Sequence, residues 1–80
     1  MAISLILHIT GEDSIVVDVE ELPSPTDQFL LGLNPRYRDG KEVRSILPEV
    51  NQVIYPWWRI TFIEVLPSQE DEEVYGFYRD

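Results

Sequence analysis

Residues 53–65 read Val-Ile-Tyr-Pro-Trp-Trp-Arg-Ile-Thr-Phe-Ile-Glu-Val, and this stretch does most to define the fold. The runs 52–55 and 60–66 are rich in β-branched and aromatic side chains, a composition typical of strands. Only residues 56–59 stand between them, which is enough for a single tight or 3₁₀-type turn. The segment therefore predicts two short strands joined by one turn.

Upstream, apolar residues recur at every second position over residues 3–9 and again over residues 15–19. This period of two, together with many β-branched side chains, predicts two further strands. Gly11-Glu12-Asp13 lies between them and is a turn signal. The first 19 residues are therefore predicted to form a β-hairpin.

A third strand is predicted over residues 28–33, where Gly32 indicates a bend or a bulge. Asn34-Pro35 is expected to end this strand, and a loop of about a dozen residues follows. Five short strands in so short a chain indicate an all-β barrel or sandwich. Because closing a small sheet removes its edges, we predict a small, five-stranded, strongly bent barrel.

This arrangement resembles the Sm-like family of small barrels: a long first hairpin, a variable loop after the third strand, and a one-turn connection before the fifth. Residues 53–65 are similar to the fourth strand, turn and fifth strand of small bacterial and phage-type proteins of that shape. The resemblance implies an Sm-like barrel that oligomerises by strand pairing. Sm proteins bind RNA through an Asp-x-x-x-Asn element and an Arg-Gly element. Residues 22–27 stand at the first element, and only Arg59 matches the second.

We divide the chain into an Sm-like barrel domain over residues 1–66 and a tail over residues 67–80. The tail contains the acidic run 70–73 and then recovers the aromatic residues Tyr75, Phe77 and Tyr78. Aromatic side chains favour burial, so we expect this segment to dock as an extra C-terminal edge strand. Docking on its own barrel and docking on a neighbouring subunit are both consistent with the sequence.

The chain has 15 acidic and six basic residues, for a net charge of −9. This balance argues against whole-surface binding to nucleic acid or to an anionic membrane. With no cysteine and one histidine, the chain has no disulfide, thiolate site or multi-histidine metal site. The first residues do not read as a signal peptide and no apolar run is long enough to span a bilayer, so we expect a cytoplasmic protein without cofactors.

Four of the six basic residues lie within residues 36–44. Converging cations and an aromatic ring are suited to phosphate or to a nucleobase. The candidate nucleic-acid or ligand residues are Arg36, Tyr37, Arg38, Lys41, Arg44 and Arg59. The favoured alternative is that these bases neutralise the acids of the first hairpin, in the same subunit or in the next.

Two adjacent tryptophans in a strand-turn-strand passage do not easily face one core. We expect one of Trp57 and Trp58 to plug an end of the barrel and the other to lie on the surface, with Arg59 stacked on it. A large exposed aromatic side chain favours an interface. Trp57, Trp58, Tyr75 and Phe77 are therefore the candidate interface residues.

Three functions follow from these patterns. The first is a non-enzymatic, homo-oligomeric scaffold or interaction module assembled by edge-strand pairing. The alternative is binding of RNA or single-stranded nucleic acid through residues 36–44 and Arg59. The third, a small enzyme, is disfavoured because so narrow a barrel has no room for an internal pocket. His8 is interpreted as an ordinary edge or surface histidine, since the sequence places no partner for catalysis within its reach.

Overall fold

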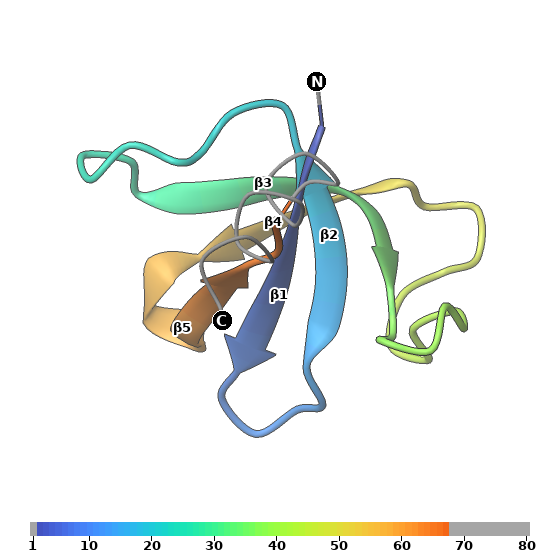
Figure 1. Cartoon of the computed structure of the whole chain (residues 1–80). Helices are drawn as coiled ribbons and strands as arrows, with labels where there is room; N and C mark the ends of the chain where they lie inside the picture. Colours follow the sequence, from blue (N-terminus) through green and yellow to red (C-terminus); the bar gives the residue numbers. More distant parts are fainter. Residues whose placement is uncertain (1, 68–80) are drawn as a thin grey trace, which may run out of the picture.

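The computed structural model describes residues 2–67 and consists of five antiparallel strands and one short 3₁₀ helix (Figure 1). The elements are β1 (Ile3–Ile9), β2 (Ile15–Val19), β3 (Phe29–Arg36), β4 (Gln52–Pro56), η1 (Trp57–Arg59) and β5 (Ile60–Val65). They form one sheet in the order β4-β3-β2-β1-β5. The predicted small, five-stranded, strongly bent all-β fold is confirmed. The extra C-terminal edge strand falls within residues 68–80, outside the described residues.

The sheet curls because β4 and β5 lie at its opposite edges yet are joined only by η1. Four strand spacings of about 4.8 Å would separate the two edges by about 19 Å in a flat sheet. A 3₁₀ segment advances only about 2 Å per residue, so the four steps from Pro56 to Ile60 span about 8 Å. The sheet must therefore bend until its two edges come near each other, as Figure 1 shows.

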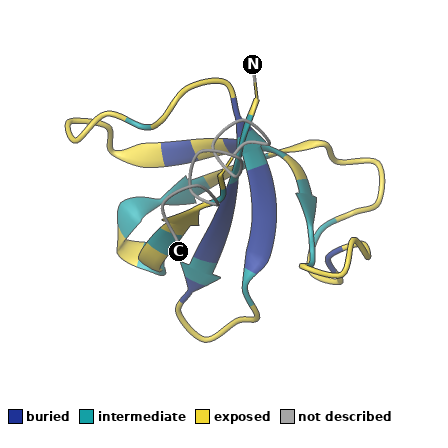
Figure 2. Cartoon of the chain, viewed as in Figure 1, coloured by how far each residue is buried: buried dark blue, intermediate teal, exposed yellow. Residues whose placement is uncertain are grey.

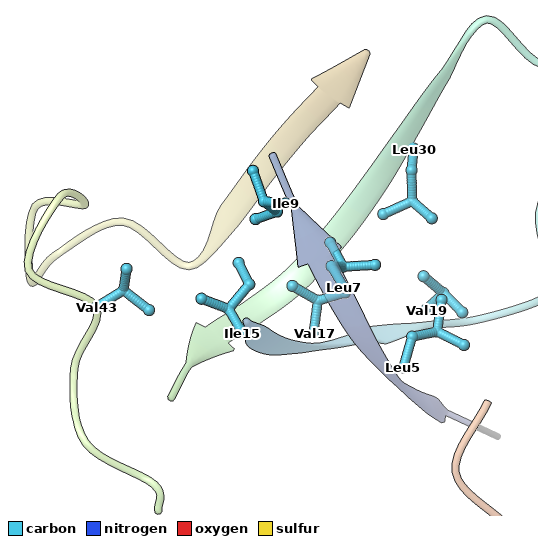
Figure 3. Close-up of a cluster of buried hydrophobic side chains, with 8 residues drawn as sticks. All are labelled: Leu5, Leu7, Ile9, Ile15, Val17, Val19, Leu30 and Val43. Atoms are coloured by element: carbon cyan, nitrogen blue, oxygen red, sulfur yellow. The ribbon is translucent and has the colours of Figure 1, made fainter. Parts of the chain in front are cut away.

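The core lies on the concave face of this curled sheet. Alternate residues of the first hairpin point into it, with Leu5 paired to Val17 and Leu7 paired to Ile15 across the two strands. These four side chains and Leu30 are the largest fully buried ones, and β1 and β2 are the most buried strands (Figure 2). The whole cluster consists of Leu5, Leu7, Ile9, Ile15, Val17, Val19, Leu30 and Val43 (Figure 3).

Asn34-Pro35 does not end β3, contrary to the prediction. Asp18 of β2 pairs with Leu33, whereas Val16 pairs with Arg36, so β3 has one more residue than β2 in this interval. Asn34 has a φ of 53°, a left-handed conformation that asparagine tolerates. A bulge also accepts a proline, which has no N–H to donate to the ladder. The strand therefore continues through a β-bulge to Arg36.

Gly32 lies where β3 crosses closest to β2. A Cβ atom at this position would stand 2.7 Å from Cβ of Val17 and within 3 Å of both its methyl groups. Val17 is fully buried in the core and has no free space into which to move. The absence of a side chain at Gly32 is thus required by the curl, as the sequence predicted for a bend.

We expect Gly32→Ala to lower the free energy of unfolding by about 1–3 kcal/mol through overpacking against Val17. Urea denaturation followed by circular dichroism measures the change. In a Val17→Ala background, the same Gly32→Ala substitution should cost less, because the two methyl groups within 3 Å are gone and only the Cβ atom at 2.7 Å remains. Equal costs in both backgrounds would contradict the close approach.

Candidate functional site

The first candidate ligand residue, Arg36, is bound within a polar network on the outer face of β2 and β3. Its guanidinium donates two hydrogen bonds to the carboxylate of Asp18, both 3.1 Å long. It also donates to the backbone oxygen of Asn34 at 2.8 Å. Ser4 Oγ donates to the same carboxylate at 2.8 Å, and Asn34 Nδ2 donates at 3.3 Å. The network centred on Asp18 therefore joins three strands, and Arg36 is not free to hold a phosphate.

Several opposing influences act on the pKa of Asp18. Burial by itself raises the pKa, since it disfavours the charged carboxylate. Hydrogen bonds from Arg36, Ser4 and Asn34, with the charge of Arg36, outweigh that influence and hold the pKa below the ordinary value for aspartate. Since the folded pKa is lowered, this carboxylate stabilises the fold above its unfolded-state pKa, and the contribution is lost as pH falls through the folded value.

Asp18→Asn should lower the free energy of unfolding by about 1–3 kcal/mol at neutral pH, because it leaves a partly buried arginine without its counter-charge. The difference from the wild type should begin to shrink below about pH 4, where this aspartate is protonated in the unfolded chain, and it should be lost as pH falls through the lowered folded pKa. Urea titrations at pH 7 and in acid test both statements. Asp13→Asn, at an exposed aspartate, removes the same charge and is the matched control.

A second candidate, Arg59, is also paired within the chain. Its guanidinium donates to the carboxylate of Glu12 in the β1–β2 turn, and its backbone oxygen accepts a hydrogen bond from Thr10 N at 3.0 Å. Burial raises the pKa of the neighbouring Tyr55, Glu12 raises it further, and Arg59 acts in the opposite direction. Arg36 and Arg59 thus both neutralise acids of the first hairpin in the same subunit, as the alternative interpretation of the basic residues expected.

The remaining cations, Arg38, Lys41 and Arg44, form no ion pair within residues 2–67 and are exposed. They lie on the connection between β3 and β4, around a tight turn that Gly40 permits with a φ of 88°. Tyr37 packs against the core, and its hydroxyl accepts a hydrogen bond from Arg44 N at 3.2 Å. Tyr37 is therefore part of the support of this turn, with its ring turned inward.

The two tryptophans divide as the sequence predicted. Trp57 packs against the hydrophobic core, and its indole N–H donates to the backbone oxygen of Asp27. Trp58 is 78% exposed, and the guanidinium carbon of Arg59 lies 5.9 Å from its ring centroid. Tyr75 and Phe77, the other candidate interface residues, lie outside the described residues.

The two outer strands of the sheet carry exposed apolar side chains and few charges. β4 contains no charged residue, and Ile54 at its centre is 61% exposed. On β5, Phe62 and Val65 are each 53% exposed. Glu64 is the only charged residue of β5, and it hydrogen-bonds to His8 of β1. Among residues 2–67, no strand pairs with the outer edge of β4 or β5, and both edges are apolar and almost uncharged.

His8 has a carboxylate partner that sequence reasoning missed. Its Nε2 lies 2.6 Å from Glu64 Oε1, and its ring stacks on Phe62 with centroids 3.9 Å apart. The signal was present in the period of two, since His8, Phe62 and Glu64 share one face once β1 and β5 pair. Within residues 2–67, no nucleophile hydrogen-bonds to this histidine, and the pair ties β5 to β1.

Sequence reasoning also missed a groove of about 700 Å³ between β3 and the chain that connects β2 to β3. Its lining combines apolar residues, among them Leu22, Phe29 and Leu31, with the acidic residues Glu20, Glu21 and Asp27. No basic residue lines it. We refer to this feature as the β3 groove.

No protein-family model, curated protein or solved structure matches this chain. Among residues 2–67, no three acidic or histidine side chains are grouped so as to hold a metal ion. The same part of the chain contains no helix with the length and apolar character needed to cross a membrane. The candidate functional features are therefore the open strand edges, the exposed cations and the β3 groove.

Proposed function

We propose that this chain is a non-enzymatic, Sm-like, homo-oligomeric scaffold in which β4 of one copy pairs with β5 of the next. The observation that carries the proposal is that both edges are apolar and almost uncharged. Folded monomers usually block their edge strands with charged residues, prolines or bulges, because free N–H and C=O groups invite another strand. β4 has a proline only at its end. β5 has a bulge only near its start, where His8 pairs with Phe62 and Ile9 with Ile60, and its one charge is already bound to His8.

The side chains beside the edges support the same proposal. Ile54 lies opposite Leu31 on the neighbouring strand, and both are exposed. Phe62 provides an exposed apolar surface at the other edge of the sheet. Pairing of β4 with β5 of a neighbour would bring these surfaces together and remove apolar area from water.

Because the two edges differ, each copy would use one edge for each neighbour. Such a heterologous contact closes into a ring when the rotation between copies allows it, and otherwise extends into a filament. The strand order and the single turn between β4 and β5 support the Sm-like assignment. A non-enzymatic role is supported by an interior filled with leucine, isoleucine and valine side chains, which leaves no internal site for a substrate.

Ile54→Lys should dissociate the assembly to monomers, since it places a charge at the centre of the pairing edge. Size-exclusion chromatography with light scattering measures the mass. Leu47→Lys is the matched control, because Leu47 is 66% exposed but lies on the β3–β4 connection, away from both edges. A wild-type protein that remains monomeric across micromolar concentrations would overturn the proposal.

Arg38, Lys41 and Arg44 favour one second candidate, binding of single-stranded RNA through the β3–β4 connection. Removing two phosphate contacts with Arg38→Ala/Arg44→Ala should reduce the slope of log K against log salt concentration by about 1.4. Fluorescence anisotropy with a labelled oligonucleotide measures this slope. Arg59→Ala should leave the slope unchanged, because Glu12 already neutralises Arg59. Failure to bind at low salt would exclude this candidate.

A further inference from the structure

We propose that the β3 groove binds an extended, positively charged peptide of another protein, which adds as a strand to a free edge of β3. This binding site lies on the side of β3 away from β4, and Leu31 borders both it and the surface beside the β4 edge. It rests on three properties of the groove: an unpaired strand edge, an apolar lining and an acidic rim.

The unpaired edge follows from the different lengths of β2 and β3. The ladder between them ends at Asp18 and Leu33, whereas β3 begins at Phe29. Residues 29–31 pair with β4 on one side, and no residue of β2 is paired with them on the other. Figure 1 shows the connection from β2 to β3 arching away above this half of β3. The backbone groups of residues 29–31 that point away from β4 therefore have no strand beside them in the part of the chain that the structure describes.

The lining shows that it is the edge of β3 that faces the groove. Phe29, Leu30 and Leu31 all line it. Successive side chains of a strand point to opposite faces, so three consecutive residues contribute together only when the strand presents its edge. An incoming extended segment would find backbone hydrogen-bonding groups along this edge, the arrangement used in recognition by strand addition.

The apolar lining provides contacts for the side chains of such a segment. Leu22, Phe29 and Leu31 are all exposed. Leu22 approaches from the connection, and the other two come from β3. A groove of about 700 Å³ is within the usual range for ligand sites. Aliphatic side chains on alternate positions of a peptide would fit this surface.

The acidic rim selects the charge of the peptide. Glu20, Glu21 and Asp27 line the groove, and Asp27 is held in place by accepting a hydrogen bond from Ser24 N at 2.8 Å. Three carboxylates without a lining cation attract lysine and arginine, and the net charge of −9 strengthens that attraction at long range. Charge complementarity therefore favours a cationic partner.

Two segments of this chain are less suitable occupants. The C-terminal segment carries four consecutive acids at residues 70–73, which the rim would repel. The β3–β4 connection of a second copy contains three bases, but also three acids, at residues 39, 42 and 49. Neither segment matches the groove as well as a peptide in which bases alternate with aliphatic residues.

The test uses the full chain and a labelled synthetic peptide in which arginine and valine alternate, with binding followed by fluorescence anisotropy. We expect saturable binding that weakens with added salt, since exposed ion pairs are screened. A peptide with glutamate in place of arginine should not bind. A peptide with proline at its centre keeps most of the charge but lacks a strand N–H, and it should bind more weakly.

Glu20→Gln/Glu21→Gln should weaken binding about tenfold, because it removes two ion pairs at the rim. The matched control is Glu42→Gln/Glu49→Gln, which makes the same change in net charge at exposed positions outside the groove. Hydrogen exchange of those amides of residues 29–31 that point away from β4 should slow in the complex. Ile54→Lys should leave peptide binding intact even if it dissociates the scaffold, so the two proposals fail separately.

Several results would overturn the proposal. Equal loss of affinity in the two glutamine pairs would show that only net charge matters. Equal affinity for the proline-containing peptide would exclude strand addition. Peptide affinity that falls as protein concentration rises would show that a second copy occupies the groove instead. Tighter peptide binding after removal of residues 68–80 would show that the C-terminal segment occupies it.

Discussion

The three-residue link Trp57–Arg59 connects two strands that lie at opposite edges of the same sheet, and the other features of the fold depend on this constraint. A flat sheet would place those edges farther apart than the link can reach. The sheet therefore curls, and its concave face closes around leucine, isoleucine and valine side chains. The same curl presses β3 onto β2, which excludes a side chain at Gly32.

Curling the sheet buries one face but leaves unpaired backbone groups at its margins. Within the described residues 2–67, no strand pairs with the outer edges of β4 and β5, and β3 has an unpaired stretch where it extends beyond β2. Both proposals rest on this shared chemistry, since an unpaired edge can accept another strand. The charges beside each edge indicate which kind of partner that edge would bind. β4 is uncharged and suits another copy of the chain, whereas the acidic rim of the β3 groove suits a cationic peptide.

Electrostatics within the chain gives the basic residues two different roles. Arg36 and Arg59 pair with Asp18 and Glu12 of the first hairpin, so they contribute to the fold. The other cations of residues 38–44 remain exposed at a supported turn. In the sequence, the basic residues at positions 36–44 form one cluster. Their closeness along the chain does not show which of them pairs with an acid. The period of two places Arg36 on the outer face of β3 only after the bulge at Asn34 is known.

The sequence by itself determined the strands, the single turn between the last two of them, the requirement for glycine at position 32 and the separate environments of the two tryptophans. These features depend on local backbone preferences and on the alternation of apolar residues, which are legible along the chain. Only the tertiary structure decided which charges pair, that Glu64 reaches His8, and that an acidic groove opens beside β3. Those features depend on strand order, register and the unequal lengths of β2 and β3, which are settled by contacts between residues far apart in the chain.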